Sequence, residues 1–379
     1  MIGFSLDDSQ RAFQELARRF AVDVIRPAAA RCDETEEMDW DIYAKAHGLG
    51  LTNFYIPEKY GGGGVDDYVS QALITEELGW GCAGIATNFI GGMGVVHALL
   101  NGGSEEQMRK YLPALAGPDF RAAVAMTEPS AGSDASAIKT RALRQSDGSY
   151  VINGTKSFIT NAAVADVILL FATVDPSKRA KGVTAFLIDR GTPGLKIGSK
   201  EHKMGQRAAG SWTVFLDDVH VPAESRLGDE GKGFAAAMGT FVSFRSVVAA
   251  RAVGIGRAAF EYARDYAKER HTFGKPIIQH EGVGFKLADM ATRLHAARYL
   301  VWAAADATNH GEDVVARASM AKCYATDAAM YITTEAVQIL GCYGYSREAP
   351  VEKWMRDAKG QQILEGPNEI QRWIISRQM

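Results

Sequence analysis

The order of local sequence patterns along the 379-residue chain constrains its fold more than any other feature. Apolar residues recur at helical spacing through about the first 120 residues, short β-type runs fill about 121–230, and long helical patterns follow. Strands and helices therefore do not alternate, as a doubly wound sheet would require. This order disfavours a Rossmann domain and predicts a mainly α protein with a central β domain.

The first helix is predicted to follow the cap signal of Ser5, Asp7 and Asp8, and Pro27 is expected to end or kink it. Glycine-rich breaks separate further predicted helices at 40–47, 66–79, 83–101 and 105–115. Seven short strands are predicted at 122–126, 138–144, 149–153, 156–160, 166–174, 183–189 and 211–217. Strands of this length with turns between them are typical of a small barrel or sandwich.

Long Ala-rich helical patterns cover 233–269, 283–309 and 313–340, and two shorter helices are predicted at 351–360 and 367–377. Antiparallel helices of this length form a four-helix bundle. We therefore expect an N-terminal α-helical domain over 1–120, a middle β-barrel domain over 121–230 and a C-terminal four-helix-bundle domain over 231–379.

Charge and apolar content restrict the partners. Lys and Arg total 42 against 45 Asp and Glu, a formal net charge of −3, which argues against a nucleic-acid partner. No uninterrupted apolar stretch approaches the ~18 residues of a membrane helix, so no membrane insertion is expected. The start MIGFSLDDSQ resembles neither a secretory leader nor a transit peptide, which predicts a cytoplasmic protein. The four cysteines show no zinc spacing, and no metal site is expected.

Several segments could carry chemistry, although each also has a structural explanation. The run MTEPSAGSD at 126–134 offers hydroxyls and amides that a flat ligand could approach, or is simply a turn. Strand alternation would place Phe158 and Thr160 on one face, as an aromatic surface beside a hydroxyl donor or as an ordinary cross-strand pair. Residues 270–276, RHTFGKP, could bind an anion, or their basic side chains could stabilise the C-terminal end of the helix by interacting with its dipole.

Two later segments also have both a functional and a structural interpretation. The run QILGCYG at 338–344 ends a helix with glycines, where backbone could meet a ligand or merely form a C-cap. In LEGPNE at 364–369, Glu365 lies between apolar residues and a helix start, where it could act as a base or lie in a solvated loop.

These segments occur together in the order found in the acyl-CoA dehydrogenases, which the chain resembles over nearly its whole length. The resemblance is carried by IPEKYGG, MTEPSAGSD, NGTKSFITN, KMGQR, ERHTFGKPI, QILGCYGY, MRDAK and LEGPNEIQR. It implies an N-terminal helical domain, a middle β domain and a C-terminal four-helix bundle. The same order of domains follows from the local patterns alone.

The resemblance implies FAD between the β domain and the bundle. The positions implied around the isoalloxazine are Val124, Met126, Thr127, Phe158, Ile159 and Thr160. Ser133 is implied to lie near both the flavin and the thioester. Asn368 and Glu369, which follow the catalytic base Glu365 in the sequence, are implied to lie beside the flavin. A neighbouring subunit is implied to grip the adenosine diphosphate half through Arg270, Thr272, Phe273, His280, Gln338 and Gly341. This implies a dimer at minimum and commonly a homotetramer, a dimer of dimers.

Glu365 aligns with the catalytic base of the family. A carboxylate is suited to removing the proton alpha to a thioester carbonyl, because expelled water raises its basicity. Ser133, Arg245 and Gly366 are the implied substrate-binding residues, and hydride passes from the beta carbon to flavin N5. The expected product is a trans-2-enoyl-CoA, within fatty acid β-oxidation, and electrons are expected to pass to an electron-transfer flavoprotein.

Some positions depart from the family pattern. Pro367 stands where Thr is usual, so that one flavin contact cannot be carried over. The resemblance also implies that some branches of the family carry their base one residue before the arginine that matches Arg245. That position is Phe244 here, which cannot act as a base, and this leaves Glu365 as the single candidate. Val242 and Ile90 differ from the medium-chain type, so chain length does not follow from the resemblance. The alternatives are an acyl-CoA oxidase, for whose extra domain the chain has no room, and a non-catalytic flavin-binding or interaction protein on the same fold.

Overall fold

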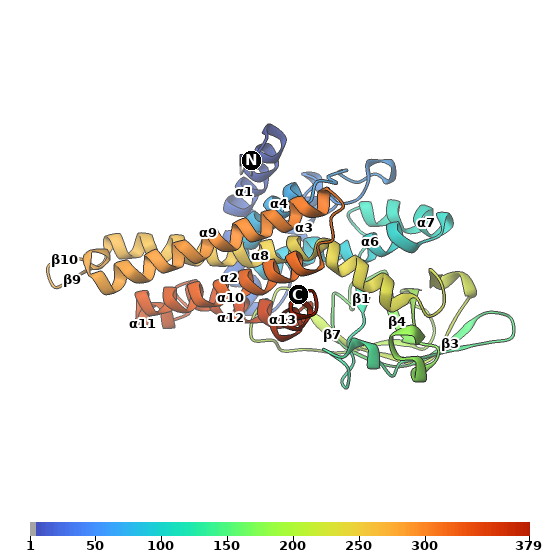
Figure 1. Ribbon diagram of the computed structural model, residues 1–379. Helices are drawn as coiled ribbons and strands as arrows, with labels where there is room; N and C mark the ends of the chain where they lie inside the picture. The colour runs from blue at the N-terminus through green and yellow to red at the C-terminus, as the bar shows by residue number, and fades with distance from the viewer. Residues whose placement is uncertain (1–4) are drawn as a thin grey trace.

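The computed structural model describes residues 5–379 and has the predicted order of a helical part, a sheet and a helical bundle (Figure 1). The first part contains α1 (Asp8–Phe20), α2 (Arg26–Thr35), α3 (Trp40–Gly48), α4 (Tyr68–Gly81), α5 (Ala83–Ile90), α6 (Met93–Gly102) and α7 (Glu105–Ala116). The predicted helix at 83–101 is thus two helices, because Gly91 and Gly92 interrupt it.

Pro27 was expected to end or kink the first helix, but it does not end the helical path and lies instead in the first turn of α2. A π-helical turn at Ala21–Ile25 precedes it and joins α1 to α2. Proline lacks the amide that would bond to the carbonyl four residues earlier, and a wider turn before it accommodates that loss. The helical path therefore continues through Pro27 to Thr35.

The middle part is an eight-stranded sheet with the order β6-β7-β3-β2-β4-β5-β8, and β1 pairs in parallel with β4. The strands are β1 (Ala122–Ala125), β2 (Arg141–Arg144), β3 (Tyr150–Thr160), β4 (Val167–Thr173), β5 (Val183–Asp189), β6 (Leu195–Lys200), β7 (Ser211–Val221) and β8 (Arg226–Leu227). The sequence prediction missed β6 and β8. It also split β3 in two, whereas both halves pair with β7 across register shifts at Ile152/Gly154 and Lys156/Ile159.

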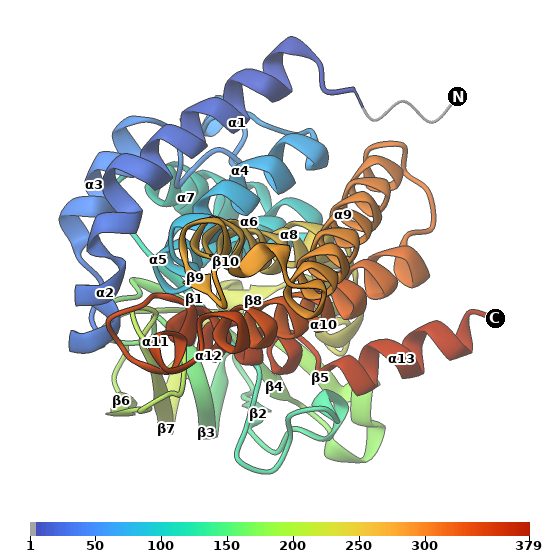
Figure 2. The same ribbon diagram turned by 90° about the vertical axis from the view of Figure 1, so that its left-hand side faces the viewer.

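The last part is built on α8 (Gly233–Glu269), α9 (Glu281–Asn309), α10 (Val315–Leu340) and α12 (Val351–Ile363), followed by α13 (Asn368–Arg377). A small hairpin of β9 (His271–Thr272) and β10 (Lys275–Pro276) joins α8 to α9, and the short α11 (Cys342–Tyr345) follows α10. Figure 2 looks along these helices and shows α4 beside α8. Helix α4 packs on α8 and α9, so the first part and the bundle share one interior.

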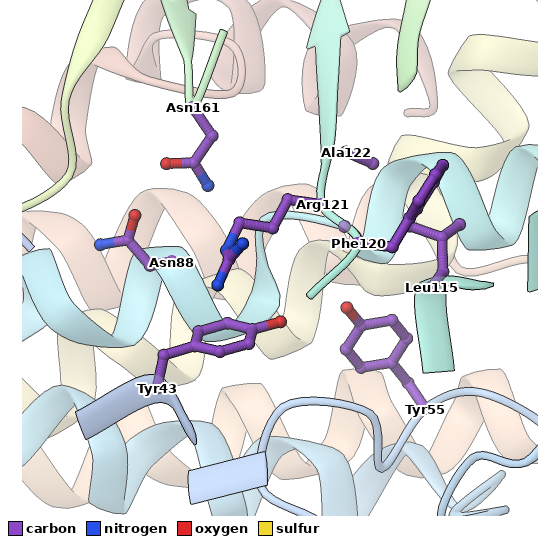
Figure 3. Close-up of a pocket in the computed structure, with 9 residues that line it drawn as sticks. Tyr43, Tyr55, Asn88, Leu115, Phe120, Arg121, Ala122 and Asn161 are labelled. Carbon is purple, nitrogen blue, oxygen red and sulfur yellow. The ribbon is translucent and has the colours of Figure 1, made fainter. Parts of the chain in front are cut away.

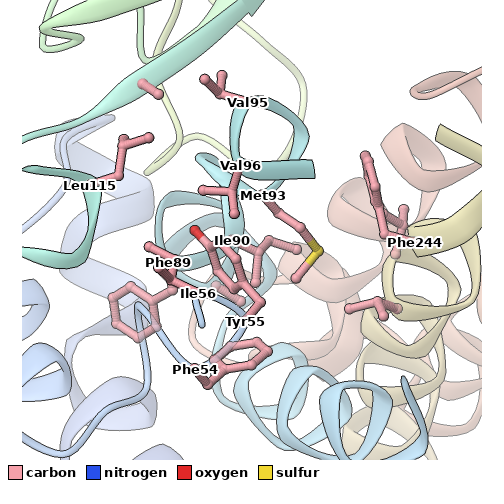
Figure 4. Close-up of a cluster of buried hydrophobic side chains, with 14 of the residues drawn as sticks. Phe54, Tyr55, Ile56, Phe89, Ile90, Met93, Val95, Val96, Leu115 and Phe244 are labelled. Carbon is pink, nitrogen blue, oxygen red and sulfur yellow. The ribbon is translucent and has the colours of Figure 1, made fainter. Parts of the chain in front are cut away.

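A large apolar cluster joins the helical first part to the sheet and to α8. Figure 4 shows Tyr55, Phe89 and Met93 of the first part in the same cluster as Phe244 of α8, with Met93 extending toward Phe244. Two helical stretches, Ala83–Gly102 and Gly233–Glu269, reach the length and mean hydropathy of a membrane span. Their most apolar windows are 72% and 56% buried inside the protein, as expected of helices that serve its core.

Buried charges also join the first part to the bundle. The carboxylate of Glu76 on α4, whose residue is 1% exposed, accepts hydrogen bonds from Arg257 of α8 at 2.9 Å and from Arg298 of α9 at 2.7 Å. Arg257 also binds Glu77 at 2.7 Å. Because every member has a partner of opposite charge, the cluster fixes how α4 seats on α8 and α9.

His97 predicts acid sensitivity of the fold. It is 8% exposed, its ring lies 5.7 Å from that of Phe244 and 6.1 Å from that of Tyr68, and its Nε2 has no partner among the described residues. Burial lowers the pKa of His97 from 6.5 to about 4. Between these two pH values His97 is protonated in the unfolded chain and neutral in the folded chain. Stability is therefore lost as pH falls from 6.5 toward 4.

We expect the free energy of unfolding, measured with urea, to fall between pH 7 and pH 4.5 by about 2–3 kcal/mol more in the native chain than in His97→Phe. The Phe variant keeps an aromatic ring at this position and removes the titrating group. Equal losses in both proteins would show that His97 does not drive the acid sensitivity.

Candidate active site

Glu365 lies in the short connection between α12 and α13, next to the long helices α8 and α10. Its backbone has φ +56°, a left-handed conformation that is unfavourable for a residue with a side chain, and Gly366 follows with φ +87°. Such a conformation persists only where surrounding contacts impose it. Lys322 Nζ and Gln371 Nε2 both donate to the Gly366 carbonyl, at 2.9 and 3.0 Å.

Three cations surround the Glu365 carboxylate, and all are buried. Arg251 of α8 is 1% exposed, and its Nη2 lies 3.7 Å from Glu365 Oε1. Arg245 of the same helix is 6% exposed and donates to Ser319 Oγ at 3.0 Å, and Lys322 of α10 has no exposed surface. The carboxylate itself keeps 41% of its side-chain surface accessible. A group held among buried cations on one side and open on the other can receive a proton from a ligand on its open side.

Burial and the three cations act in opposite directions on Glu365. The protein packed around the carboxyl desolvates it and raises its pKa, although 41% of the side-chain surface stays accessible, and the charges of Arg251, Lys322 and Arg245 lower that pKa, with desolvation the larger effect. The pKa is therefore raised above its usual 4.5. A carboxylate with a raised pKa is a stronger base than an ordinary surface glutamate.

The turn at 126–134 is fixed by a buried ion pair. Lys156 of β3, which is fully buried, donates from Nζ to Glu128 Oε1 at 2.8 Å and to the Met126 carbonyl at 3.0 Å. The amides of Lys139 and Thr140 donate to the same carboxylate at 2.6 and 2.9 Å. The Ser157 amide donates to the Thr127 carbonyl at 2.9 Å, so this turn and β3 form one unit.

The candidates on β3 border this unit. Phe158 has φ +57° and 61% exposure, in the register shift between Lys156 and Ile159, so simple strand alternation does not set its direction. Ile159 is buried, and Thr160 is half-buried with its Oγ1 3.3 Å from Ser211 Oγ. An exposed aromatic ring on a strained backbone at a strand bulge is typical of a ligand-facing position.

The sheet approaches the bundle beside these residues. A Cβ atom on Gly94 of α6 would lie 3.1 Å from Val124 Cγ2 and 3.9 Å from Phe244 Cζ. Glycine at this position therefore lets α6 approach Val124 of β1 closely while it also contacts α8 at Phe244, the residue before Arg245. Of the other candidates, Met126 is buried, Thr127 half-buried and Ser133 exposed.

A separate pocket of about 490 Å³ lies where the β9–β10 hairpin meets the ends of α8 and α10. Its lining includes the candidates Arg270, Thr272, Phe273, His280 and Gly341. The Phe273 ring is 96% exposed, and His280 Nε2 lies 3.1 Å from the Thr272 carbonyl. Gln338 is exposed one helical turn before Gly341. The structure thus brings five of the six residues predicted to hold the adenosine diphosphate into one pocket.

Figure 1 shows that the β9–β10 hairpin and the sheet lie at opposite ends of the molecule. The residues predicted around the isoalloxazine and those predicted around the adenosine diphosphate are therefore apart within one subunit.

A second cavity lies between the first part and β1 (Figure 3). It is lined by Tyr43, Tyr55, Asn88, Arg121 and Asn161 among others, and its volume is about 10 Å³. This is room for about one water molecule, so it is not a substrate site.

Sequence reasoning missed Arg251 and Lys322. Both interrupt Ala-rich helical stretches, where a charge usually faces solvent. Arg251 donates to Thr87 Oγ1 of α5 at 2.7 Å and to Gln361 Oε1 of α12 at 3.3 Å. The signal in the sequence was a cation placed amid small apolar residues on both sides, as in VVAARAVG at 247–254.

Asn368 is another candidate whose contacts are now defined. It is 2% exposed, and its amide bonds to Lys322, Thr326 and Asp327 of α10. Glu369 beside it is exposed. The Asn368 side chain thus ties the start of α13 to α10.

Comparison with known families and structures agrees with this architecture. Models of the acyl-CoA dehydrogenase N-terminal, middle and C-terminal domains match residues 7–119, 123–219 and 231–379. The chain is 43% identical over 370 residues to an acyl-CoA dehydrogenase of Bacillus subtilis, covering 97% of each chain.

Two solved structures are similarly close. Butyryl-CoA dehydrogenase from Megasphaera elsdenii has a TM-score of 0.96 and 42% identity, covering 100% of this chain and 99% of that one. A structure described under the electron transferring flavoprotein of Acidaminococcus fermentans has a TM-score of 0.95 and 39% identity, with coverages of 100% and 99%. The chain therefore belongs to the acyl-CoA dehydrogenase family of flavoprotein oxidoreductases.

Proposed function

We propose that this protein oxidises an acyl-CoA thioester to the trans-2-enoyl-CoA, with Glu365 as the base that removes the α-proton. The observation that carries the proposal is the Glu365 carboxylate, whose pKa is raised and which lies among three buried cations of α8 and α10. The proton leaves the α-carbon for a Glu365 oxygen, and the electron pair of the broken bond forms the new double bond as hydride leaves the β-carbon.

FAD is the group that would accept this hydride, and the residues present fit it. The pocket of about 490 Å³ is bordered by the exposed Arg270, which can pair with a pyrophosphate, and by the exposed Phe273 ring, which can stack on a flat base. At the sheet, the exposed Phe158 and the polar Thr127 and Thr160 would border the isoalloxazine.

The chain's own residues would orient the thioester. The Glu365 backbone amide is the donor proposed for the carbonyl oxygen, where negative charge develops as the α-proton leaves. The buried charges of Arg245, Arg251 and Lys322 favour that negative charge as well. Ser133 and Gly366 remain the other candidates for contact with the substrate.

We infer that the working unit is a homotetramer built as a dimer of dimers, in which each FAD uses the hairpin pocket of a neighbouring subunit. The separation of the two FAD-binding groups within one chain supports this arrangement. Electrons would then pass to an electron-transfer flavoprotein in the cytoplasm. The similarity to the structure described for such a flavoprotein system supports this partner.

Arg270→Gln is expected to weaken FAD binding without unfolding the chain. The side chain is exposed and lines the hairpin pocket, so its loss removes a charge-assisted contact to an anion, worth about 1.5–3 kcal/mol, or roughly ten- to a hundredfold in affinity. Equilibrium dialysis of FAD would measure this change. Lys268→Gln, an exposed lysine outside the pocket lining, is the control, and equal affinities in all three proteins would contradict the assignment.

An anaerobic titration tests the proposed reaction and its substrate class. Purified yellow protein would be mixed with butyryl-, isovaleryl-, octanoyl- and palmitoyl-CoA in turn while the visible flavin absorbance is followed. Bleaching by at least one thioester is expected, and because butyryl-CoA dehydrogenase is a close structural neighbour, butyryl-CoA is the first choice. A flavin that none of them bleaches would contradict the proposal.

A further inference from the structure

Lys322 is a buried cation for which the reaction scheme above assigns no direct contact with substrate. Its residue has no exposed surface, and within residues 5–379 no carboxylate oxygen lies within 4.0 Å of its Nζ. Its partners are instead the Gly366 carbonyl at 2.9 Å, Asn368 Oδ1 at 3.0 Å and the Gln362 carbonyl at 3.5 Å. All three partners flank Glu365 in sequence.

These contacts hold the segment 362–368, which carries Glu365. Gln362 lies in the last turn of α12 and Asn368 begins α13, so one ammonium group binds both ends of the connection and its middle. Glu365 holds a left-handed backbone of φ +56° inside this connection. A conformation of that kind costs roughly 1–3 kcal/mol and needs external contacts to persist.

Charged groups face this pair from three elements. Glu365 is faced by Arg245 and Arg251 of α8 and by Lys322 of α10. Lys322 is faced by Glu365, by Arg245, and by Cys323 and Asp327 of its own helix. Asp327 is already paired with Arg372 of α13 at 2.5 Å and accepts a hydrogen bond from the Asn368 amide at 2.7 Å. The Lys322 charge is therefore directed chiefly toward Glu365.

We propose that Lys322 is a positioning residue, whose ammonium holds the 362–368 connection so that the Glu365 carboxylate is kept in place and its ionised form is favoured. This inference rests on the proposed role of Glu365 as the base. It assigns to α10 a function in the active site besides packing.

The first test reads the ionisation of Glu365 without any substrate. Infrared difference spectra of the holoenzyme against Glu365→Gln isolate the band of the protonated Glu365 carboxyl, and its loss with rising pH gives the titration midpoint. Lys322→Met removes the ammonium and keeps an unbranched chain of similar length. We expect the midpoint to rise by about one pH unit, because a nearby positive charge no longer favours the carboxylate.

The second test reads the position of the base. We expect the rate of flavin reduction by the best thioester at pH 7 to fall by roughly 100-fold in Lys322→Met, since small displacements of a reacting group have costs of this size. Thr333→Val is the matched control. Thr333 is fully buried on the same helix, roughly 16 Å along its axis, and among residues 5–379 its hydroxyl bonds only to the Ala329 and Met330 carbonyls.

The outcomes separate the two proposals. A midpoint raised in Lys322→Met and unchanged in Thr333→Val supports the role of Lys322, whereas equal midpoints in all three proteins overturn it. If Lys322→Met does not fold, Lys322→Gln keeps a donor, removes the charge and must show the same rise. If no thioester reduces the native flavin, the proposed function fails, and the infrared titration still decides whether Lys322 acts on Glu365.

Discussion

Glu365→Gln is expected to slow flavin reduction by an acyl thioester by roughly 10³-fold while FAD stays bound. Glutamine has the size of glutamate but cannot accept the α-proton. Phe244, which precedes Arg245 on α8, has a ring that cannot accept the proton in place of Glu365. Stopped-flow absorbance under anaerobic conditions would measure the rate, and the visible spectrum would confirm the bound flavin.

The same substitution is expected not to destabilise the fold. Because the pKa of Glu365 is raised on folding, the folded chain binds a proton that the unfolded chain releases, and stability falls as pH rises from the unfolded value of 4.5 through the folded one. A neutral glutamine avoids that loss. Glu34→Gln, on an exposed face of α2, is the control and should keep the native rate. A Glu365→Gln enzyme with the native rate would exclude Glu365 as the base.

Lys156→Met is expected to have the largest effect on stability, a loss of about 3–5 kcal/mol together with loss of bound FAD. Lys156 is fully buried, and its removal leaves the Glu128 carboxylate, at 5% exposure, without its counterion. Burial lowers the pKa of Lys156 to about 8, and Glu128 opposes that shift. The turn at 126–134 would then lose the contact that fixes it to β3.

Two further variants serve as controls for Lys156→Met. Glu128→Gln combined with Lys156→Met removes both charges and should recover part of the lost stability, because no isolated charge then stays buried. Lys110→Met breaks the exposed pair with Asp189, in which the two side chains are 59% and 47% exposed, and should cost less than 1 kcal/mol. Urea unfolding would measure all four proteins. A Lys156→Met loss no larger than that of Lys110→Met would contradict the account.

The sequence was sufficient for the fold class and for most helices, because long apolar periodicity leaves few other arrangements. It failed where pairing partners far along the chain decide the structure. Asn153-Gly154 is typical of a hairpin turn, yet both sides of it pair with β7, so the chain continues as one strand with a bulge. Strand β6, with the exposed Lys196, the half-buried Lys200 and Gly198, has no strong strand pattern of its own.

The candidate site divides in a similar way. Glu365 could be found because the resemblance fixes it in a motif, whereas Arg251 and Lys322 were predicted only as helix residues, and the small apolar residues around Arg251 were the one sign that its charge is buried. Helices α8 and α10 are packed on several sides, by α4, α9, α12 and each other, and a single sequence does not show that crowding. Burial on all sides turns an ordinary charge into one that acts on Glu365.

The most direct test of the central claim is a single turnover that counts product against flavin. Native holoenzyme would be mixed without oxygen with butyryl-CoA, or with the thioester that bleaches it best, and the quenched mixture analysed by mass spectrometry. If Glu365 removes the α-proton, we expect one trans-2-enoyl thioester to form for each flavin bleached, and bleaching to be slower when the α-carbon carries deuterium. Bleaching without an enoyl product, or at the same rate with deuterium, would contradict α-proton abstraction as the reaction of this site.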